Sequence, residues 1–348
     1  MNSFWKNTTD DPSNWRNLPE NYEIIFYSSG STGAPKQIVH TKATLEASAR
    51  GTLEFYQLKK WDRWGLTLPP EHVSGAMVLV RSLLQGSDAP IAKNDRELDK
   101  FIIAENFACL SLVSTQLYRL LLKPSPVLIK KLQKMKVILL GGGSFSPELL
   151  AKCKELNLPC SLTYGMTETA SQIFATKIGD PLGYRHILPG RKIKMVNEEI
   201  YVGGDCLATN LSLDSENFFA TGDCGAITAD QGLIIFGRKD QMLISGGENI
   251  YPDKIENIFK SIPGIADAIV VGKDDPEWGQ AICIILKVTD HLDSAELKKA
   301  KIKLRPYEWP KNFYQLNSDQ WQKLLNNFKV SLTKAKEYVV KNSPTNIR

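Results

Sequence analysis

Residues 27–36 read Tyr-Ser-Ser-Gly-Ser-Thr-Gly-Ala-Pro-Lys, and they follow an apolar, β-branched and aromatic run over 22–27 that predicts a strand. The glycines let the backbone fold tightly, and the hydroxyl and N–H groups can donate hydrogen bonds to phosphate oxygens. Lys36 adds a positive charge at the end of the loop. The alternative is an ordinary serine- and glycine-rich turn. The strand before the loop and the Pro-Lys after it favour a phosphate loop. The Walker A pattern does not fit, because Pro35 stands where that pattern requires glycine.

The bulk composition describes an ordinary globular protein. The 348 residues are 43% hydrophobic and 23% charged, which suits two or three domains. A mild, scattered net charge of +5 does not indicate nucleic acid as a partner. The six cysteines show no CxxC spacing and the four histidines complete no zinc set, so we expect reduced thiols in or near the core. We see neither a signal segment nor a membrane span, and we therefore expect a cytoplasmic protein.

Hydrophobic periodicity and turn signals predict alternating strands and helices. The expected strands cover 37–39, 66–68, 101–113 and 137–140, and the expected helices cover 44–56, with Thr44 as its cap, and 114–122. The last of these strands runs into a glycine triplet at 141–143 and then into a helix that begins at Pro147. This order of strand, glycine loop and helix is typical of an α/β nucleotide site.

Two polar side chains stand out between residues 69 and 84. His72 falls in a loop between a strand-like and a helix-like segment, where functional residues concentrate. Arg81 interrupts an apolar run over 76–84, so it would need an anionic partner if that helix is buried. The alternatives are a structural histidine and an arginine at a helix surface with its head in water.

Residues 163–172 read TYGMTETASQ, and they combine an aromatic ring, a glycine, hydroxyls and a carboxylate. Such a set can serve one nucleotide, with Tyr164 against a base, Thr167 on the α-phosphate and Glu168 as an oxygen ligand of Mg²⁺. The alternative is a helix N-terminus that threonine caps, with the glutamate in its first turn.

From residue 199 the chain becomes rich in hairpins. A strand is expected to end in a turn at Asp223, which closes the sequence Phe-Ala-Thr-Gly-Asp. Residues 237–256, GRKDQMLISGGENIYPDKIE, then lead into a small α/β unit. Its expected elements are a helix over 252–261, strands over 268–271 and 281–288, and a basic amphipathic helix over 295–304.

Together these motifs resemble those of the acyl-adenylate-forming superfamily, which includes acyl-CoA ligases, luciferases and peptide-synthetase adenylation domains. Residues 28–37 resemble its [ST]SG[ST]TGxPKG signature, with Gln37 where glycine is usual. Residues 164–168, 221–223 and 237–256 resemble its YGxTE, TGD and GRxDxxIxxGGxxIxPxxIE motifs. The resemblance implies an α/β fold with a β-rich segment before the hinge. A large N-terminal adenylate-binding domain over 1–238 and a small mobile C-terminal α/β domain over 239–348 are expected, with Asp240 as the hinge.

The resemblance also implies roles for single residues. Catalysis is expected to involve Lys36, Thr167 and Glu168, the last as the metal ligand. The residues expected at ATP or AMP are Ser28, Ser29, Gly30, Ser31, Thr32, Gly33, Gly142, Gly143, Tyr164, Gly165, Asp223 and Arg238. Of these, Asp223 and Arg238 would contact the ribose. Gly246 and Gly247 are expected at CoA.

The chain departs from the family pattern in two places. The phosphate loop begins at residue 27, so we expect a compact form that lacks most of the usual N-terminal subdomain. No Gly-Lys pair occurs in 305–348, where the family's adenylation lysine usually stands, and Lys336 and Lys334 are the nearest candidates. If neither lysine reaches the site, adenylation should be slow.

Two passages resemble the o-succinylbenzoate–CoA ligases of menaquinone biosynthesis: His-Val-Ser-Gly at 72–75, with an arginine nine residues after the histidine, and TYGMTETASQ. The resemblance implies a ligase that uses ATP, Mg²⁺ and CoA on a small aromatic or acyl carboxylate, through an acyl-adenylate. The acid is expected to contact His72, Ser74, Arg81 and Ser171, with Arg81 holding its second carboxylate.

Three other functions stay open: another aryl- or acyl-CoA ligase, a stand-alone adenylation domain, and a degenerate nucleotide-binding homologue. A homodimer also stays open.

Overall fold

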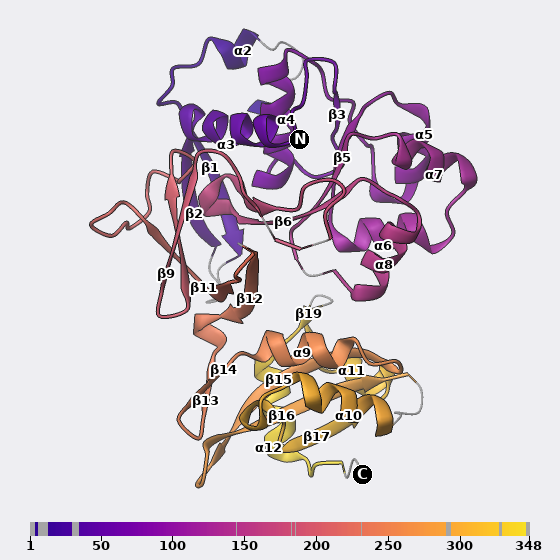
Figure 1. Ribbon diagram of the computed structural model, residues 1–348, viewed down its shortest axis with the longest axis vertical. Coiled ribbons are helices and arrows are strands. Elements are labelled where there is room, and N and C mark those ends of the chain that lie inside the picture. Colours follow the sequence, from indigo (N-terminus) through magenta and orange to yellow (C-terminus); the bar gives the residue numbers. More distant parts are fainter. Residues whose placement is uncertain are drawn as a thin grey trace. The chain divides into compact units, whose positions relative to one another are not determined.

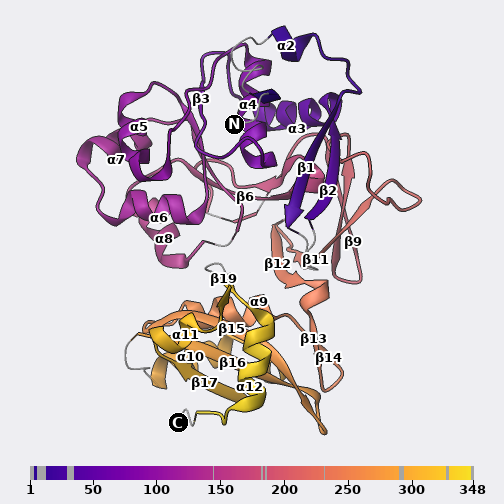
Figure 2. The ribbon, with the colours of Figure 1, turned by 180° about the vertical axis from the view of Figure 1, so that it is seen from behind.

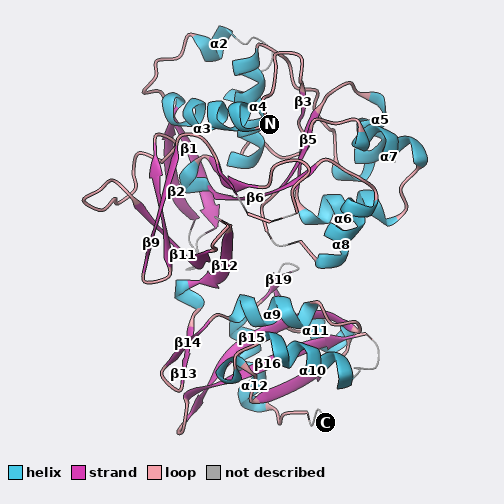
Figure 3. Cartoon of the chain, viewed as in Figure 1, coloured by secondary structure: helices cyan, strands magenta, loops and turns pink. Residues whose placement is uncertain are grey.

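The computed structural model describes residues 4–5, 13–29, 35–143, 145–181, 183–184, 186–230, 232–289, 294–326 and 329–345. The fold mixes helices and strands along the chain, which confirms the expected α/β class (Figure 3). The chain divides into two compact units (Figure 1). One comprises Met1–Thr221 and Ile227–Ile234, and the other comprises Gly222–Ala226 and Ile235–Arg348. A hinge at Asp240, with a domain boundary at that point, stays a prediction.

A six-stranded sheet in the order β3-β4-β5-β6-β7-β8 is the frame of the first unit. Its strands are β3 Trp64–Gly65, β4 Cys109–Leu112, β5 Val137–Leu140, β6 Cys160–Met166, β7 Ser171–Ala175 and β8 His186–Ile187. Strands β3 to β6 are parallel, whereas β7 and β8 join antiparallel. Every residue of β4 and β5 is buried, as expected for parallel strands with both faces covered.

Helices cover both faces of this sheet (Figures 1 and 2). They are α3 Lys42–Phe55, α4 Val73–Gln85, α5 Leu98–Ala104, α6 Ser114–Leu122, α7 Pro126–Gln133 and α8 Pro147–Glu155. Side chains of β5 alternate between two apolar clusters because successive residues of a strand face opposite sides. Val137 and Leu139 pack with α3 and α4, and Ile138 and Leu140 pack with α5 to α8.

The hairpin of β1 (Glu23–Ser29) and β2 (Pro35–Thr41) frames the predicted phosphate loop and confirms both expected strands. Its register pairs Ser29 with Pro35. Residues 30–34 and the side chains of Ser28 and Ser29 lie outside the described residues. The predicted contacts of Ser28, Ser29, Gly30, Ser31, Thr32 and Gly33 with phosphate therefore stay predictions.

The structure corrects several local predictions. Helix α3 is capped by Thr41, and Thr44 is the partner in its capping box, so Thr44 is not the cap. The strand over 101–113 is wrong in its first part, where the apolar spacing of Leu98 and Ile102 forms α5 instead. The helix start considered for 163–172 is absent: that stretch forms β6, a short 3₁₀ turn over Thr167–Thr169, and β7.

Four further strands follow in the region expected to be rich in hairpins: β9 Arg191–Val196, β10 Glu199–Gly204, β11 Phe219–Ile227 and β12 Leu233–Arg238. Strands β9 and β10 pair antiparallel across a turn at Asn197 and Glu198, whose positive φ angles suit a tight hairpin. Strand β11 continues through Asp223, so the expected strand end at that residue is wrong.

The second unit has a three-stranded sheet in the order β15-β16-β17. Its elements are β13 Leu243–Ser245, β14 Glu248–Ile250, α9 Pro252–Lys260, β15 Ile265–Asp275, β16 Gly279–Val288, α10 Ser294–Lys303, β17 Asn312–Leu316 and α12 Leu332–Lys341. The expected helices and strands of this unit are confirmed. Helices α9 and α10 cover one face of the sheet and α12 covers the other. The short elements of the chain are α2 Ser13–Arg16, α11 Ser318–Gln322, β18 Leu325–Asn326 and β19 Lys329–Val330.

The six cysteines are all buried and free, which confirms their expected place in or near the core. Within the described residues, no helix combines the length and the apolar character needed to cross a membrane.

Candidate active site

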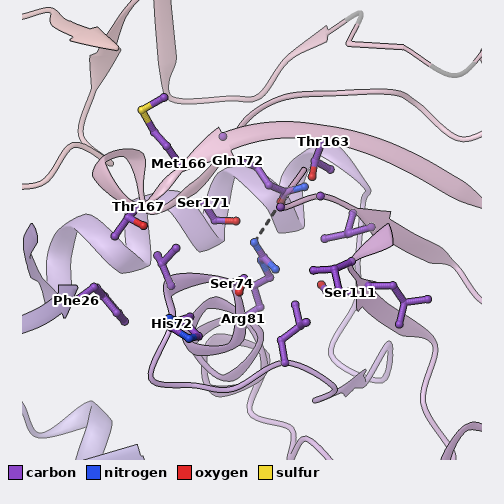
Figure 4. Close-up of a pocket in the computed structure, with 18 of the residues that line it drawn as sticks. Phe26, His72, Ser74, Arg81, Ser111, Thr163, Met166, Thr167, Ser171 and Gln172 are labelled. Atoms are coloured by element: carbon purple, nitrogen blue, oxygen red, sulfur yellow. Dashed lines mark hydrogen bonds between the residues drawn. The ribbon is translucent and has the colours of Figure 1, made fainter. Parts of the chain in front are cut away.

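A cavity of about 280 Å³ lies in the first unit where the parallel strands β4, β5 and β6 end (Figure 4). Ligands of open α/β sheets bind at this edge. Of the residues predicted from the sequence, the cavity brings together His72, Ser74, Arg81, Gly142, Gly165, Thr167 and Ser171. These residues come from α4, the loop after β5 and the two sides of the β6–β7 turn. The acyl-binding and nucleotide-binding predictions therefore meet in one cavity.

Glycine is required at two points beside this cavity. A Cβ on Gly165 would lie 1.7 Å from the carbonyl oxygen of Ser171, because the backbones of β6 and β7 approach closely at a register shift. A Cβ on Gly141 would lie 2.7 Å from Oγ1 of Thr163, and Gly142 has a φ of +78°. A side chain at Gly165 or Gly141 would therefore force its neighbours to move.

The β6–β7 turn holds strained backbone. Ala170 and Ser171 have φ angles of 48° and 88°, which non-glycine residues rarely adopt. Two hydroxyls fix the turn: Thr169 Oγ1 donates to the carbonyl oxygen of Ser171, and Ser48 Oγ donates to that of Ala170. This conformation places Ser171 on the cavity wall. Strain of this kind persists where the surroundings over-determine it, as they do here.

Arg81 is the most unusual residue of the cavity. Its side chain is 1% exposed, and Nη2 donates to Gln172 Oε1 at 3.2 Å. The guanidinium carbon lies 5.0 Å from the centre of the Trp64 ring, a cation–π contact. Nε has no hydrogen-bond partner, and no carboxylate among the described residues pairs with the guanidinium. Burial lowers the pKa of Arg81 from 12.5 to about 9.

A second arginine is buried nearby, and it too has no carboxylate partner among the described residues. Arg191 of β9 donates to the carbonyl oxygens of Gln172, Pro189 and Ser48 at 2.7 to 3.0 Å. Burial lowers its pKa, and its charge contributes to the lowered pKa of Arg81. Two buried cations, with no carboxylate partner in the described part of the chain, give this end of the cavity a positive potential that favours an anionic ligand.

His72 and Ser74 stand at the start of α4. His72 occupies the N-cap position with an exposed imidazole, and Ser74 is half-buried on the first turn. Figure 4 shows both on the same side of the cavity as Arg81. Their contact with the acid stays a prediction.

Thr167 is tied to the strand that leaves the phosphate loop. His40 of β2 is completely buried, and its Nε2 donates to the carbonyl oxygen of Thr167 at 2.7 Å. Because a carbonyl can only accept, Nε2 carries the proton and Nδ1 accepts from Thr44 Oγ1 at 2.9 Å. Burial lowers the pKa of His40 from 6.5 to about 4, so the ring is neutral near pH 7.

The other nucleotide residues of the first unit that the structure describes in full lie outside the cavity lining. The Tyr164 ring is buried in β6, 6.0 Å from that of Tyr184. Gly143 and Lys36 also lie outside the lining, and Lys36 is exposed. Glu168 is half-buried, and its carboxylate makes no ion pair with any described residue. Among the described residues there is no group of three acidic, histidine or cysteine side chains that could hold a metal. The role of Glu168 as a ligand of Mg²⁺ stays a prediction.

In the second unit, the predicted ribose residues contact each other. Arg238 Nη1 lies 3.1 Å from Asp223 Oδ1, and Arg238 Nε lies 3.4 Å from Asp240 Oδ1. Burial alone would lower the pKa of Arg238, but the two carboxylates outweigh it and raise that pKa. Gly222 leaves room for this arrangement, since a Cβ there would lie 2.8 Å from Arg238 Nη2.

The predicted CoA glycines line a separate surface cavity of about 750 Å³ in the second unit. Gly246 and Gly247 form the β13–β14 turn with φ angles of 59° and 80°. A Cβ on Gly246 would lie 2.9 Å from the Trp278 ring, and Lys311 Nζ lies 4.1 Å from the centre of the same ring. The glycines thus shape this cavity, and their contact with CoA stays a prediction.

The two candidate adenylation lysines differ in their contacts. Lys334, on the first turn of α12, is half-buried and donates from Nζ to the carbonyl oxygen of Leu325 at 2.7 Å. Lys336 is exposed on the same helix and makes no hydrogen bond or ion pair with the described residues. Lys336 is thus the more available of the two.

Sequence reasoning missed three residues that shape the site: Gln172, Arg191 and His40. Gln172 closes the motif 163–172 and could have been found there, since it follows the predicted Ser171. Arg191 and His40 carry no local signal, because their partners lie far away in the sequence.

Comparison with known proteins fixes the family. The family model of the AMP-binding enzymes matches residues 4–207, which is more than half of the chain. The chain belongs to the AMP-binding enzyme family. The model of the AMP-binding enzyme C-terminal domain matches residues 254–320, within the second unit. The superfamily expected from the motifs is thereby confirmed.

Among curated relatives of this family, 2-succinylbenzoate–CoA ligases are similar to the chain. The ligase of Enterococcus faecalis is 31% identical over 326 residues, covering 86% of this chain and 66% of the relative. That of Escherichia coli is 33% identical over 292 residues, covering 81% and 62%. The chain thus spans slightly less than two thirds of the length of these relatives.

Solved structures of enzymes of the same kind are similar to the chain in fold. Escherichia coli MenE with a bound phenylether-linked analogue of OSB-AMS matches with a TM-score of 0.77 at 29% identity, covering 93% of this chain and 71% of that one. The o-succinylbenzoate–CoA synthetase of Bacillus subtilis, in complex with ATP and magnesium, matches with a TM-score of 0.74 at 29% identity, covering 84% and 66%.

Proposed function

We propose that the protein is an ATP-dependent acid–CoA ligase that converts o-succinylbenzoate to its CoA thioester, a step of menaquinone biosynthesis. The observation that carries this proposal is Arg81, a fully buried cation on a cavity wall for which the described residues supply no carboxylate partner. The substrate has two carboxylates and only one is activated, so the other is free to satisfy the guanidinium. Charge-assisted hydrogen bonds of this kind are strong. The curated relatives with this activity support the choice.

The reaction has two steps. In the first, an oxygen of the succinyl carboxylate attacks the α-phosphorus of ATP, and pyrophosphate leaves with the electrons of the broken P–O bond. In the second, the CoA sulfur attacks the acyl carbon, AMP leaves, and the thiol proton passes to solvent. Both steps depend on positioning and on stabilised charge.

The residues of the chain have distinct tasks in this scheme. Arg81 anchors the benzoate carboxylate at the buried end of the cavity, which leaves the succinyl end near Thr167. Thr167 positions the α-phosphate, held by the bond from His40 to its carbonyl oxygen. Lys36 and the phosphate loop neutralise pyrophosphate. Mg²⁺, bound in part by Glu168, would supply a Lewis acid for the phosphates. Asp223 and Arg238 bind the ribose. Rotation of the C-terminal domain about Asp240 switches the enzyme from adenylate formation to thioester formation.

The six free, buried cysteines suit the reducing cytoplasm, which we propose as the location. The other functions differ in their products. A stand-alone adenylation domain would release pyrophosphate but would pass the acyl group to a carrier protein rather than to CoA. A degenerate homologue would bind ATP without releasing pyrophosphate.

The test is acid-dependent release of pyrophosphate from ATP and Mg²⁺, with o-succinylbenzoate compared with benzoate and a fatty acid. We expect release with o-succinylbenzoate alone, and a CoA thioester when CoA is added. Pyrophosphate release only with another acid would refute o-succinylbenzoate as the substrate. ATP binding without release for any acid would discard the ligase and favour the degenerate homologue.

A further inference from the structure

A buried threonine stands behind the wall of the acid cavity. Thr52 lies on α3 with 0% exposure and does not line the cavity. Its Oγ1 lies 2.9 Å from Oε1 of Gln172, and the same oxygen accepts from Arg81 Nη2 at 3.2 Å. Gln172 does line the cavity. Thr52, Gln172 and Arg81 thus form a chain of contacts from α3 to the cavity.

The proton positions in this chain follow from the chemistry of its members. A guanidinium only donates, so the Gln172 atom between it and Thr52 is the amide oxygen. The Thr52 hydroxyl therefore donates to that oxygen at 2.9 Å rather than to the carbonyl oxygen of Ser48 at 3.3 Å, and the bond holds the side chain of Gln172 by its oxygen. The oxygen is the only hydrogen-bond acceptor of Arg81 among the described residues. The Thr52 hydroxyl consequently sets the position of the guanidinium without touching the cavity.

Arg191 braces the backbone of the same residue. Its Nε donates to the carbonyl oxygen of Gln172 at 3.0 Å, while Nη2 donates to the carbonyl oxygen of Ser48 at 3.0 Å and to Ser48 Oγ at 2.8 Å. Gly51 gives the guanidinium room, since a Cβ there would lie 2.0 Å from Arg191 Nη1. Thr52 holds the side chain of Gln172, and Arg191 ties its main chain to α3.

We propose that Thr52 and Arg191 are positioning residues that set the specificity of the cavity for an acid with a second carboxylate. Thr52 holds Gln172, Gln172 holds Arg81, and Arg191 keeps the β7 end at a fixed distance from α3. This inference rests on the proposed function, because it assigns the anionic end of the same cavity.

Two substitutions at Thr52 separate the hydroxyl from the shape of the side chain. Thr52→Val keeps the branched shape and removes the donor, whereas Thr52→Ser keeps the donor. For Thr52→Val we expect about a tenfold rise in KM for o-succinylbenzoate. This rise corresponds to a loss of about 1.4 kcal/mol in binding free energy, which is the size expected for the loss of one hydrogen bond. KM for ATP and kcat should change less than about twofold, and Thr52→Ser should restore the wild-type KM.

A role in stability alone makes a different prediction. It would lower the melting temperature of Thr52→Val while leaving the KM ratio between a dicarboxylic and a monocarboxylic acid unchanged, and that result would overturn the inference. Arg191→Lys gives a second test, since lysine keeps the charge but cannot reach the same set of acceptors. We expect Arg191→Lys to raise KM for the dicarboxylic acid more than KM for the monocarboxylic acid. Equal increases for the two acids would contradict the positioning role of Arg191.

The two proposals fail in different ways. If wild-type protein turns over o-succinylbenzoate and Thr52→Val does so with unchanged KM, only the positioning inference is refuted. If no acid supports turnover, the melting temperature with o-succinylbenzoate alone measures binding. Equal stabilisation of wild type and Thr52→Val by the acid then refutes the positioning role. The absence of any stabilisation refutes both proposals.

Discussion

Replacing Arg81 by methionine should stabilise the protein without ligand and raise KM for the acid. Methionine has a similar length and no charge, so it fills the space of the arginine stem beside Trp64 and removes the buried charge at this position. The two effects have opposite signs because the guanidinium has no carboxylate partner among the described residues, whereas the bound acid would supply one. Functional residues of this kind commonly cost stability.

The magnitude follows from the lowered pKa. A fall from 12.5 to about 9, at about 1.36 kcal/mol for each pKa unit, means that folding with Arg81 charged costs roughly 4 to 5 kcal/mol. The group is a cation with a lowered pKa, so this cost is fully present below pH 9 and is relieved only as the pH rises through 9. The substitution also removes the hydrogen bond to Gln172 and the contact with Trp64, worth roughly 2 to 3 kcal/mol together. A net gain of about 1 to 3 kcal/mol remains.

The assay pairs stability with kinetics. Without ligand, Arg81→Met should melt a few degrees above the wild type near pH 7.5. Loss of one member of a desolvated charge pair costs about 2 to 5 kcal/mol. We therefore expect KM for o-succinylbenzoate to rise by about 30-fold or more. KM for ATP serves as the internal control, and benzoate shows how much of the effect depends on the second carboxylate.

Two results would refute this reasoning. A lower melting temperature for Arg81→Met would mean that the arginine stabilises the empty protein and needs no ligand. Equal increases in KM for o-succinylbenzoate and benzoate would mean that Arg81 does not bind the second carboxylate. Arg81→Lys separates charge from geometry, because lysine keeps the cation but has no planar fork.

Three further predictions address other parts of the site. Because His40 is buried in its neutral form with a pKa near 4, the free energy of unfolding should fall by up to roughly 3 kcal/mol as the pH drops from 6.5 to 4. Urea titrations at several pH values should show a weaker pH dependence for His40→Asn. An unchanged pH dependence would contradict the assignment. Ser171→Gly should relieve the φ of 88° and stabilise the protein by about 1 kcal/mol, while KM for the acid rises; a destabilised variant would show that the turn is not strained. Lys336→Ala should slow pyrophosphate release by about 100-fold or more and spare thioester formation from synthetic acyl-adenylate, whereas a larger effect in Lys334→Ala would move the role to that residue.

Three motifs predicted segments of the cavity wall: residues 72–75 at the start of α4, the glycines after β5, and residues 163–172 at the β6–β7 turn. Strand β5 and the glycines after it are read locally from apolar residues and turn signals. Arg81 could be recognised as a residue in need of an anion, since it interrupts an apolar helix. The choice between a buried and a snorkelling arginine needed the structure, which shows α3, β3 and β7 enclosing it.

The errors have physical causes of the same kind. The run 101–113 combines apolar residues that suit a helix and a strand equally, and tertiary packing divides it at residue 105. The Thr41–Thr44 pair offers two hydroxyls, and only the backbone geometry decides which one caps the helix. The supports of Gln172 come from α3 and β9, which no spacing rule connects to 163–172.

The antiparallel hairpin of β6 and β7 has a consequence for how the chain folds. It pairs Thr163 with Ala175, close neighbours along the chain, whereas the parallel pair of β3 and β4 joins Trp64 to Cys109. Closing a short loop costs less entropy than closing a long one, so local pairings form early. The pairing of β6 with β7 can thus form within microseconds, whereas the strained turn between them takes its final shape only when α3 brings Ser48 to the carbonyl oxygen of Ala170.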